Sequence, residues 1–130
     1  MPDTSEILRK YRTIAVVGLS NNPMRPSHGV SEYMKNQGYK INPVNPGHAQ
    51  ILGEKSYRTL EDIPEPVDIV NIFRRSEMIP PIVDSALAIG AKVIWMQEGI
   101  EHEAAAEKAR AAGVDVVMNT CILKAHRRLM

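Results

Sequence analysis

The sequence predicts an α/β fold, in which one domain is built around a doubly wound, mainly parallel sheet with helices on both faces. Short apolar runs of strand length alternate along the chain with stretches whose apolar residues recur at helical spacing. The first strong apolar run, Thr13 to Val17, ends at Gly18, and a polar loop and a helix beginning near Ser27 follow it. This strand, tight turn and helix form the opening unit of a Rossmann-like sheet.

Most of the predicted strands are short apolar runs, typical of strands buried on both faces of a parallel sheet, and the second is marked by the turn residues at its end. In chain order the strands are expected at residues 13–18, 40–44, 67–73, 93–96 and 114–118. The segment between the second and third of these is expected to be loop-rich, with a brief strand near 55–57 and one helical turn capped by Thr59.

The predicted helices are indicated by apolar residues at helical spacing and by residues typical of helix ends. Asp3 and Glu6 resemble a capping box for a first short helix. Pro80 and Pro81 fit the first turn of a later helix, where a missing N–H costs little. Glycines close three of the helices as residues just past the helix end. The helices are therefore expected at residues 3–11, 27–37, 79–89, 101–112 and 121–129.

The composition narrows the classes of partner. Lys and Arg together number 16 against 15 for Asp and Glu, so no overall field favours nucleic acid or an anionic membrane. No apolar run approaches the roughly 20 residues that span a bilayer, and the N-terminus lacks the pattern of a signal peptide. A single cysteine excludes an internal disulfide framework and suits a reducing compartment. We therefore expect a cytoplasmic domain with no nucleic-acid or membrane partner.

In such sheets a ligand binds beyond the carboxyl ends of the strands, where the strand order reverses. The helix N-terminus near Ser27 offers unpaired N–H groups and a partial positive charge to an anion. The candidate segments at this edge are residues 18–27, 45–47, 73–76, 96–99 and 118–121.

The loops indicate a ligand with phosphate groups in two separate places and not a nicotinamide or flavin dinucleotide. Ser20 stands where the dinucleotide fingerprint needs its second glycine, and no acidic residue follows the second strand. Arg25 in the first loop and the Arg74–Arg75 pair suit phosphate groups in two separate places. Coenzyme A (CoA), with its pyrophosphate and separate 3′-phosphate, fits this requirement. The alternative is that Arg25 and Arg74 pair with surface carboxylates such as Glu32 or Glu77.

Several blocks of sequence, in order and over nearly the whole chain, resemble the small bacterial and archaeal CoA-binding proteins. These are single Rossmann-like domains similar to the N-terminal CoA-binding domain of the succinyl-CoA synthetase α subunit. The blocks are Val16-Val17-Gly18-Leu19-Ser20, Arg25-Pro26-Ser27, Pro43-Val44-Asn45-Pro46, Val67-Asp68-Ile69-Val70 with Phe73-Arg74, and Trp95-Met96-Gln97-Glu98-Gly99.

The resemblance implies CoA as the ligand and nominates the residues that bind it. For the phosphates it nominates Gly18, Ser20, Arg25 and Ser27. For the adenosine side it nominates Val44, Asn45 and Pro46, and for the opposite wall Phe73, Arg74 and Arg75.

Catalytic residues are not evident in the sequence. The four histidines lack metal-ligand spacing, and no acid–base pair or triad stands out. Gln97 and Glu98 are expected near the pantetheine arm. We therefore interpret the chain as a binder of CoA or an acyl-CoA: a carrier, sensor or regulator whose protein partner is not identified. The alternatives are an NAD(P)-binding oxidoreductase, a thiol enzyme using Cys121, and an interaction module with an empty cleft.

Overall fold

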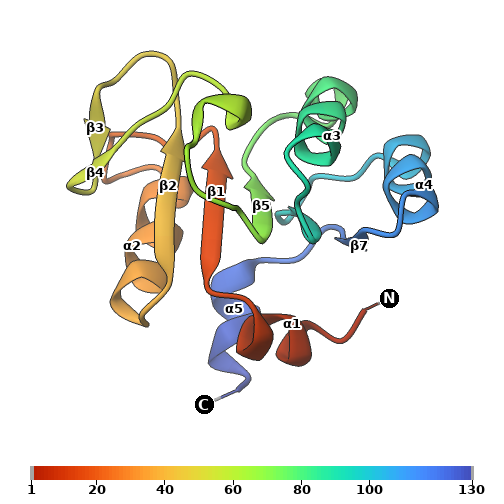
Figure 1. Cartoon of the computed structure of the whole chain (residues 1–130). Coiled ribbons are helices and arrows are strands. Elements are labelled where there is room, and N and C mark those ends of the chain that lie inside the picture. The colour runs from red at the N-terminus through yellow and green to blue at the C-terminus, as the bar shows by residue number, and fades with distance from the viewer. Residues whose placement is uncertain (1, 130) are drawn as a thin grey trace.

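Five parallel strands form the central sheet of the chain, of which the computed structural model describes residues 2–129 (Figure 1). Their order is β2-β1-β5-β6-β7. The bounds are Thr13–Val17 for β1, Lys40–Val44 for β2, Ile69–Ile72 for β5, Val93–Met96 for β6 and Asp115–Val117 for β7. Every neighbouring pair in this sheet runs parallel. The predicted Rossmann-like fold is confirmed.

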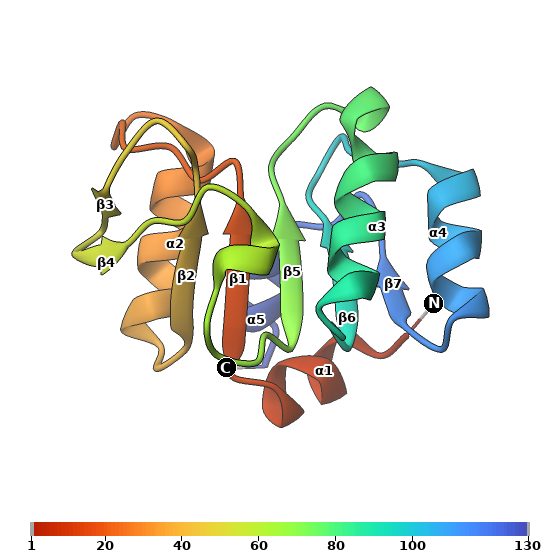
Figure 2. The same cartoon turned by 45° about the horizontal axis from the view of Figure 1, so that its top comes forward.

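The helices cover both faces of the sheet (Figure 2). One face carries α3 (Ile79–Ala88) and α4 (Glu103–Ala111), and the other carries α1 (Thr4–Lys10), α2 (Pro26–Asn36) and α5 (Ile122–Arg127). Single 3-10 turns, η1 (Leu60–Asp62) and η2 (Ser76–Met78), lie before β5 and before α3. Within residues 2–129, none of these helices has the length and apolar character needed to cross a membrane.

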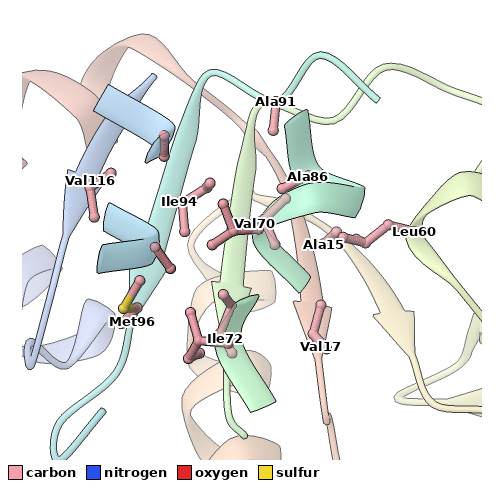
Figure 3. Close-up of a cluster of buried hydrophobic side chains, with 14 of the residues drawn as sticks. Ala15, Val17, Leu60, Val70, Ile72, Ala86, Ala91, Ile94, Met96 and Val116 are labelled. Atoms are coloured by element: carbon pink, nitrogen blue, oxygen red, sulfur yellow. The ribbon is translucent and has the colours of Figure 1, made fainter. Parts of the chain in front are cut away.

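Side chains alternate between two buried clusters because successive residues of a strand point to opposite faces. Figure 3 shows the cluster under α3 and α4, where Val70, Ile72 and Ile94 of the central strands meet Ala86 of α3. On the other face Trp95 is fully buried and donates its indole N–H to the carbonyl oxygen of Thr120 at 2.8 Å. Each large apolar side chain buried in this way stabilises the fold by roughly 1.5–3 kcal/mol.

The predicted elements differ from the observed ones mainly at the ends and in the crossover after β2. The brief strand near 55–57 is a hairpin instead, formed by β3 (Gln50–Ile51) and β4 (Glu54–Lys55). Tyr57 follows the hairpin and bridges back to Val44, because its N–H donates to Pro43 and its carbonyl oxygen accepts from Asn45, both at 2.9 Å. Long-range backbone pairing therefore overrides the local pattern in this segment.

The strand order reverses between β1 and β5, which is the central strand of the sheet. The chain passes from β1 to β2 on one side and then returns across β1 to build β5, β6 and β7 on the other. The carboxyl ends of these strands meet at one edge, where the loops gather in the upper part of Figure 2. A doubly wound sheet binds its ligands at this reversal.

Candidate ligand-binding site

Gly18 ends β1 at the point where the strand order reverses. Its φ of +86° lies in the left-handed region that favours glycine, and a Cβ at this position would lie 2.5 Å from the carbonyl oxygen of Phe73. The backbone is held from both sides, because Gly18 N–H donates to Val44 at 3.1 Å and Phe73 N–H donates to Val17 at 2.9 Å. Only glycine fits the close approach of these two strand ends.

The loop between β1 and α2 is ordered by its own hydroxyl and amide side chains. The Ser27 hydroxyl, in the first turn of α2, is buried and accepts the backbone N–H of Ser20 at 2.9 Å. The Ser20 hydroxyl accepts the N–H of Asn22 at 3.0 Å, and the Asn22 side chain accepts the N–H of Met24 at 3.0 Å. Each serine hydroxyl that accepts in this way still has a proton to donate to a ligand.

Two polar hollows adjoin at this edge of the sheet, and a smaller apolar hollow of about 190 Å³ shares Val17, Val44 and Arg58 with the larger of them. The main hollow has a volume of about 510 Å³ and lies between residues 17–22, the segment Val44 to Pro46, and three basic side chains, His48, Arg58 and Arg74. The loop hollow, of about 330 Å³, lies over the start of α2, between Arg25, Ser27 and Phe73. Gly18 and Ser20 line both hollows, so the two lie side by side.

The structure brings together all but one of the residues that the sequence nominates. Gly18, Ser20, Val44, Asn45, Pro46 and Arg74 line the main hollow, and Arg25, Ser27 and Phe73 are added by the loop hollow. Arg75 lines neither of them. Its guanidinium lies 3.3 Å from the Glu77 carboxylate, and both side chains are largely exposed.

The arginines that line the hollows carry no compensating carboxylate. Among residues 2–129, neither Arg25, Arg58 nor Arg74 has an acidic side chain within 4.0 Å. The expected alternative, in which Arg25 and Arg74 pair with Glu32 or Glu77, is therefore not what the structure shows. Arg25 stands at the loop hollow and Arg58 and Arg74 at the main hollow, and such unpaired guanidinium groups can form charge-assisted hydrogen bonds with an anionic ligand.

Asn45 joins the loops after β1 and β2. Its amide group donates to the carbonyl oxygen of Leu19 at 3.0 Å, and its side-chain oxygen accepts the N–H of Gly47 at 2.8 Å. Its backbone carbonyl oxygen accepts the hydroxyl of Ser56 at 3.0 Å. The side chain therefore shapes the wall of the main hollow through contacts within the protein.

Two basic residues at the main hollow, His48 and Arg58, were not predicted as site residues. They flank the β3–β4 hairpin, and the bridge between Val44 and Tyr57 brings Arg58 back beside the end of β2. The hairpin itself is tied down because Glu54 lies 3.2 Å from the Lys35 ammonium and 3.1 Å from that of Lys40. In the sequence, the only indication of this part of the hollow is the position of Arg58, directly after the brief strand predicted near 55–57.

Polar residues beyond β6 and β7 are occupied by contacts within the protein. Gln97 is 4% exposed, and its side-chain oxygen accepts the N–H of Ile122 at 2.9 Å. Glu98 pairs with Lys124 at 2.9 Å, and this hydrogen bond raises the pKa of the Lys124 ammonium. Cys121 is buried in the cluster under α2 and α5 and lines neither hollow. Within residues 2–129, no three His, Cys, Asp or Glu side chains are grouped as metal ligands would be.

Comparison with known proteins gives one consistent result. Residues 12–127 match the family described as "CoA binding domain". The chain is 44% identical to the uncharacterized protein YneT of Bacillus subtilis over 124 residues, which cover 95% of this chain and 92% of that protein. A solved structure of a hypothetical protein from Pyrococcus horikoshii superimposes with a TM-score of 0.95 at 38% identity, covering 98% of this chain and 89% of that one.

A further relative is a much longer enzyme. The chain is 30% identical over 106 residues to the ADP-forming acetate–CoA ligase II of Archaeoglobus fulgidus. The match covers 79% of this chain but only 16% of the ligase, so the chain corresponds to a small part of that enzyme.

Proposed function

The chain belongs to the CoA-binding domain family, and from this premise we propose that it binds coenzyme A or an acyl-CoA at the two adjoining hollows. The observation that carries the proposal is the set of three arginines, Arg25, Arg58 and Arg74, which line the hollows without acidic partners among residues 2–129. CoA carries phosphates in two places, and phosphate oxygens match the fork of donors on arginine.

The pyrophosphate is assigned to the loop hollow. Gly18 lets the backbone approach closely, Ser20 and Ser27 offer hydroxyl protons, and Arg25 supplies positive charge. The first turn of α2 adds its N-terminal partial charge, because α2 begins at Pro26 beside this hollow.

The adenosine is assigned to the main hollow. Val44, Asn45 and Pro46 form one wall, and Phe73 and Arg74 stand at the opposite side of Gly18. To these we add Arg58 and His48, which place further basic groups within reach of the 3′-phosphate. Arg75 is left out because its guanidinium pairs with Glu77.

The role that we propose is binding without chemistry, as a carrier, sensor or CoA-dependent regulator in the cytoplasm. This proposal is supported by the polar side chains at the edge, because those of Asn45 and Gln97 form hydrogen bonds within the protein that hold the loops in place. The ligase activity of the longer relative is not carried over, since the chain matches only 16% of that enzyme.

Melting temperatures with a panel of ligands test the proposal. The protein is heated with CoA, dephospho-CoA, NAD, NADP and ATP at equal concentrations. A ligand at about 100 times its Kd adds roughly 2.7 kcal/mol to the free energy of unfolding, which raises the melting temperature of a domain of this size by several degrees. We expect the largest rise with CoA. A larger rise with NAD or NADP would favour an oxidoreductase, and no rise with any ligand would favour an interaction module.

A further inference from the structure

We propose that the amino edge of the sheet carries a second recognition surface, which binds an acidic segment of a partner protein. This surface lies at the opposite edge of the sheet from the hollows, so the inference goes beyond the proposed function. Two observations carry it: where a second group of unpaired arginines lies, and how two of those arginines are held.

The arginines without an acidic partner lie in two groups. Three of them line the hollows at the carboxyl edge. A second group lies on α1 and α5 and at the ends of these helices (Figure 1). Within residues 2–129, its members have no carboxylate within 4.0 Å and are exposed: Arg9, Arg12, Arg127 and Arg128. Because α1 and α5 lie side by side at the end of the sheet where β1 begins, these four positive charges gather near the junction of the two helices.

Two of these arginines are held over tyrosine rings. The Arg12 guanidinium lies 4.8 Å from the centroid of the Tyr39 ring, and the Arg127 guanidinium lies 5.9 Å from that of Tyr33. Both distances are within the range of a cation–π interaction, which leaves the N–H groups at the edge of the guanidinium free to donate. A guanidinium that is already oriented loses less conformational entropy when it binds an anion. Both arginines are therefore prepared for a negatively charged partner.

His126 joins the two arginine–tyrosine pairs into one surface. Its ring packs edge-on against both tyrosines, with 5.4 Å between its centroid and that of Tyr33 and 5.7 Å to that of Tyr39. The Tyr33 hydroxyl also lies 2.8 Å from the imidazole Nδ1. Because Tyr39 and His126 are buried while both arginines are exposed, the rings form a floor beneath the charged groups. We refer to Arg12, Arg127 and the three rings beneath them as the arginine surface.

Carboxylate groups are the partners that the arginine surface fits best, since arginine forms paired, charge-assisted hydrogen bonds with them. Nucleic-acid bases need open aromatic faces on which to stack, but Arg127 lies over Tyr33, and Tyr39 is buried. A flat anionic membrane would also meet Asp3 and Glu6, two exposed carboxylates at the start of α1. A short acidic segment of a protein can contact the arginines and avoid these two carboxylates.

A partner on the arginine surface leaves the hollows open. α2 begins at Pro26 beside the loop hollow and carries Tyr33 of the arginine surface roughly two turns later. Figure 2 shows the loops at the carboxyl ends of the strands and the helix α1 at opposite ends of the sheet. The protein can therefore hold a ligand at one edge while it is docked at the other.

Fluorescence anisotropy of the full chain with a labelled oligoglutamate peptide tests the inference. We expect the peptide to bind at low salt, and Arg12→Ala and Arg127→Ala to raise its Kd by about 3- to 5-fold each and by about tenfold or more together. Lys108→Ala, which removes one exposed cation of α4, is the matched control and should leave the Kd within about twofold. A Kd that the double variant leaves unchanged, or that the control raises as much, would overturn the inference, as would a peptide that does not bind.

Two further measurements identify the class of partner and the place where it binds. Single-stranded oligo(dT) and vesicles of phosphatidylserine should each bind more weakly than oligoglutamate, and tighter binding of either would replace the acidic segment with nucleic acid or a membrane. In ¹⁵N NMR spectra, oligoglutamate should shift the amide signals of residues 9–12, 39–40 and 122–128. Shifts centred on residues 18–27 and 73–74 would place the peptide at the hollows and contradict the inference.

Discussion

The side-chain amide of Asn45 donates to the carbonyl oxygen of Leu19 at 3.0 Å and thereby joins the loops that follow the neighbouring strands β1 and β2. The two residues are 26 positions apart in the chain and meet only because β1 and β2 lie side by side. The carboxyl edge of the sheet is therefore held by tertiary contacts as well as by the turn chemistry of each loop.

Replacement of Asn45 by alanine removes this tie and the bond to Gly47. We expect the free energy of unfolding to fall by about 1–2 kcal/mol, because two modest hydrogen bonds are lost in a half-buried place. The affinity for CoA should fall as well, since the wall of the main hollow loses its support. Chemical denaturation and calorimetry measure the two effects. Asn36→Ala, at the exposed end of α2, is the matched control and should change neither quantity appreciably.

Gly18→Ala tests the close approach of β1 and β5. The added Cβ would lie 2.5 Å from the Phe73 carbonyl oxygen in a backbone with φ of +86°, so we expect a loss of about 1–3 kcal/mol in stability and a severe loss of CoA binding. Gly29→Ala is the control, because Gly29 lies within α2 with open space around it. The free energy of unfolding of this variant should rise by about 0.5–1 kcal/mol. A Gly18→Ala protein that melts and binds CoA like the wild type would show that the strand ends are not constrained.

Arg58→Ala and Arg74→Ala test the charges around the main hollow. A charge-assisted hydrogen bond contributes about 1.5–3 kcal/mol, so each variant should weaken CoA binding roughly 10- to 100-fold. The variant that removes the contact to the 3′-phosphate should weaken CoA much more than dephospho-CoA. Kd values measured with both ligands make that assignment. Equal losses for both ligands in both variants would mean that neither arginine contacts the 3′-phosphate.

The control for these two variants is Arg110→Ala. Arg110 lies on α4, outside both hollows, and pairs at 2.9 Å with Glu103, whose side chain is exposed. An exposed pair contributes about 0–1 kcal/mol to stability and nothing to ligand contact, so the affinity for CoA should stay at the wild-type value. A comparable loss of affinity in this control would mean that the net charge of the protein, and not the position of each arginine at the hollows, governs the affinity for CoA.

His126 makes stability depend on pH. Burial, and to a lesser extent the nearby Arg12 guanidinium, lower the pKa of this imidazole below its ordinary value of 6.5. The folded state therefore prefers the neutral ring, whose Nδ1 lies 2.8 Å from the Tyr33 hydroxyl. The stability that this preference supplies is present above pH 6.5 and is lost as the pH falls through the lowered pKa. Melting curves between pH 8 and pH 5 should show this loss.

In a His126→Gln variant the same fall in pH should cost less stability, because glutamine does not titrate in this range. The variant is expected to be less stable than the wild type at pH 8, where it loses the ring packed edge-on against Tyr33 and Tyr39. Comparing the slopes of stability against pH separates titration from packing. Parallel slopes in the two proteins would show that other groups govern the acid response.

The sequence was sufficient for the fold and for most of the residues that line the two hollows, because those features depend on local signals. The strands Lys40–Val44 and Val93–Met96 appear as predicted, since the second is an apolar run and the turn residues Asn45, Pro46 and Gly47 mark the end of the first. Gly18, Ser20 and Ser27 belong to one strand–turn–helix unit, which local chemistry defines. The carboxyl-edge rule had already selected residues 45–47, and the family resemblance added Val44, at the end of the neighbouring strand.

The parts that sequence reasoning missed depend on long-range contacts. Arg58 lies at the main hollow because its neighbour Tyr57 pairs with Val44, 13 positions earlier in the chain. No local sequence pattern predicts that bridge. Arg74 and Arg75 are equivalent in the sequence, yet only Arg74 lines the hollow while Arg75 pairs with Glu77. Which of two adjacent arginines lines the hollow is decided by the turn after β5, and composition cannot show it.

The central claim is that CoA lies over the β1–α2 loop and between the ends of β2 and β5, and an amide NMR titration tests it most directly. The backbone signals of ¹⁵N-labelled protein are followed as CoA is added to saturation. The largest shifts should come from residues 18–27, 45–48, 58 and 73–74, with residues of α4 unaffected. Shifts centred elsewhere on the molecule, or no shifts at all with CoA in large excess, would contradict the account.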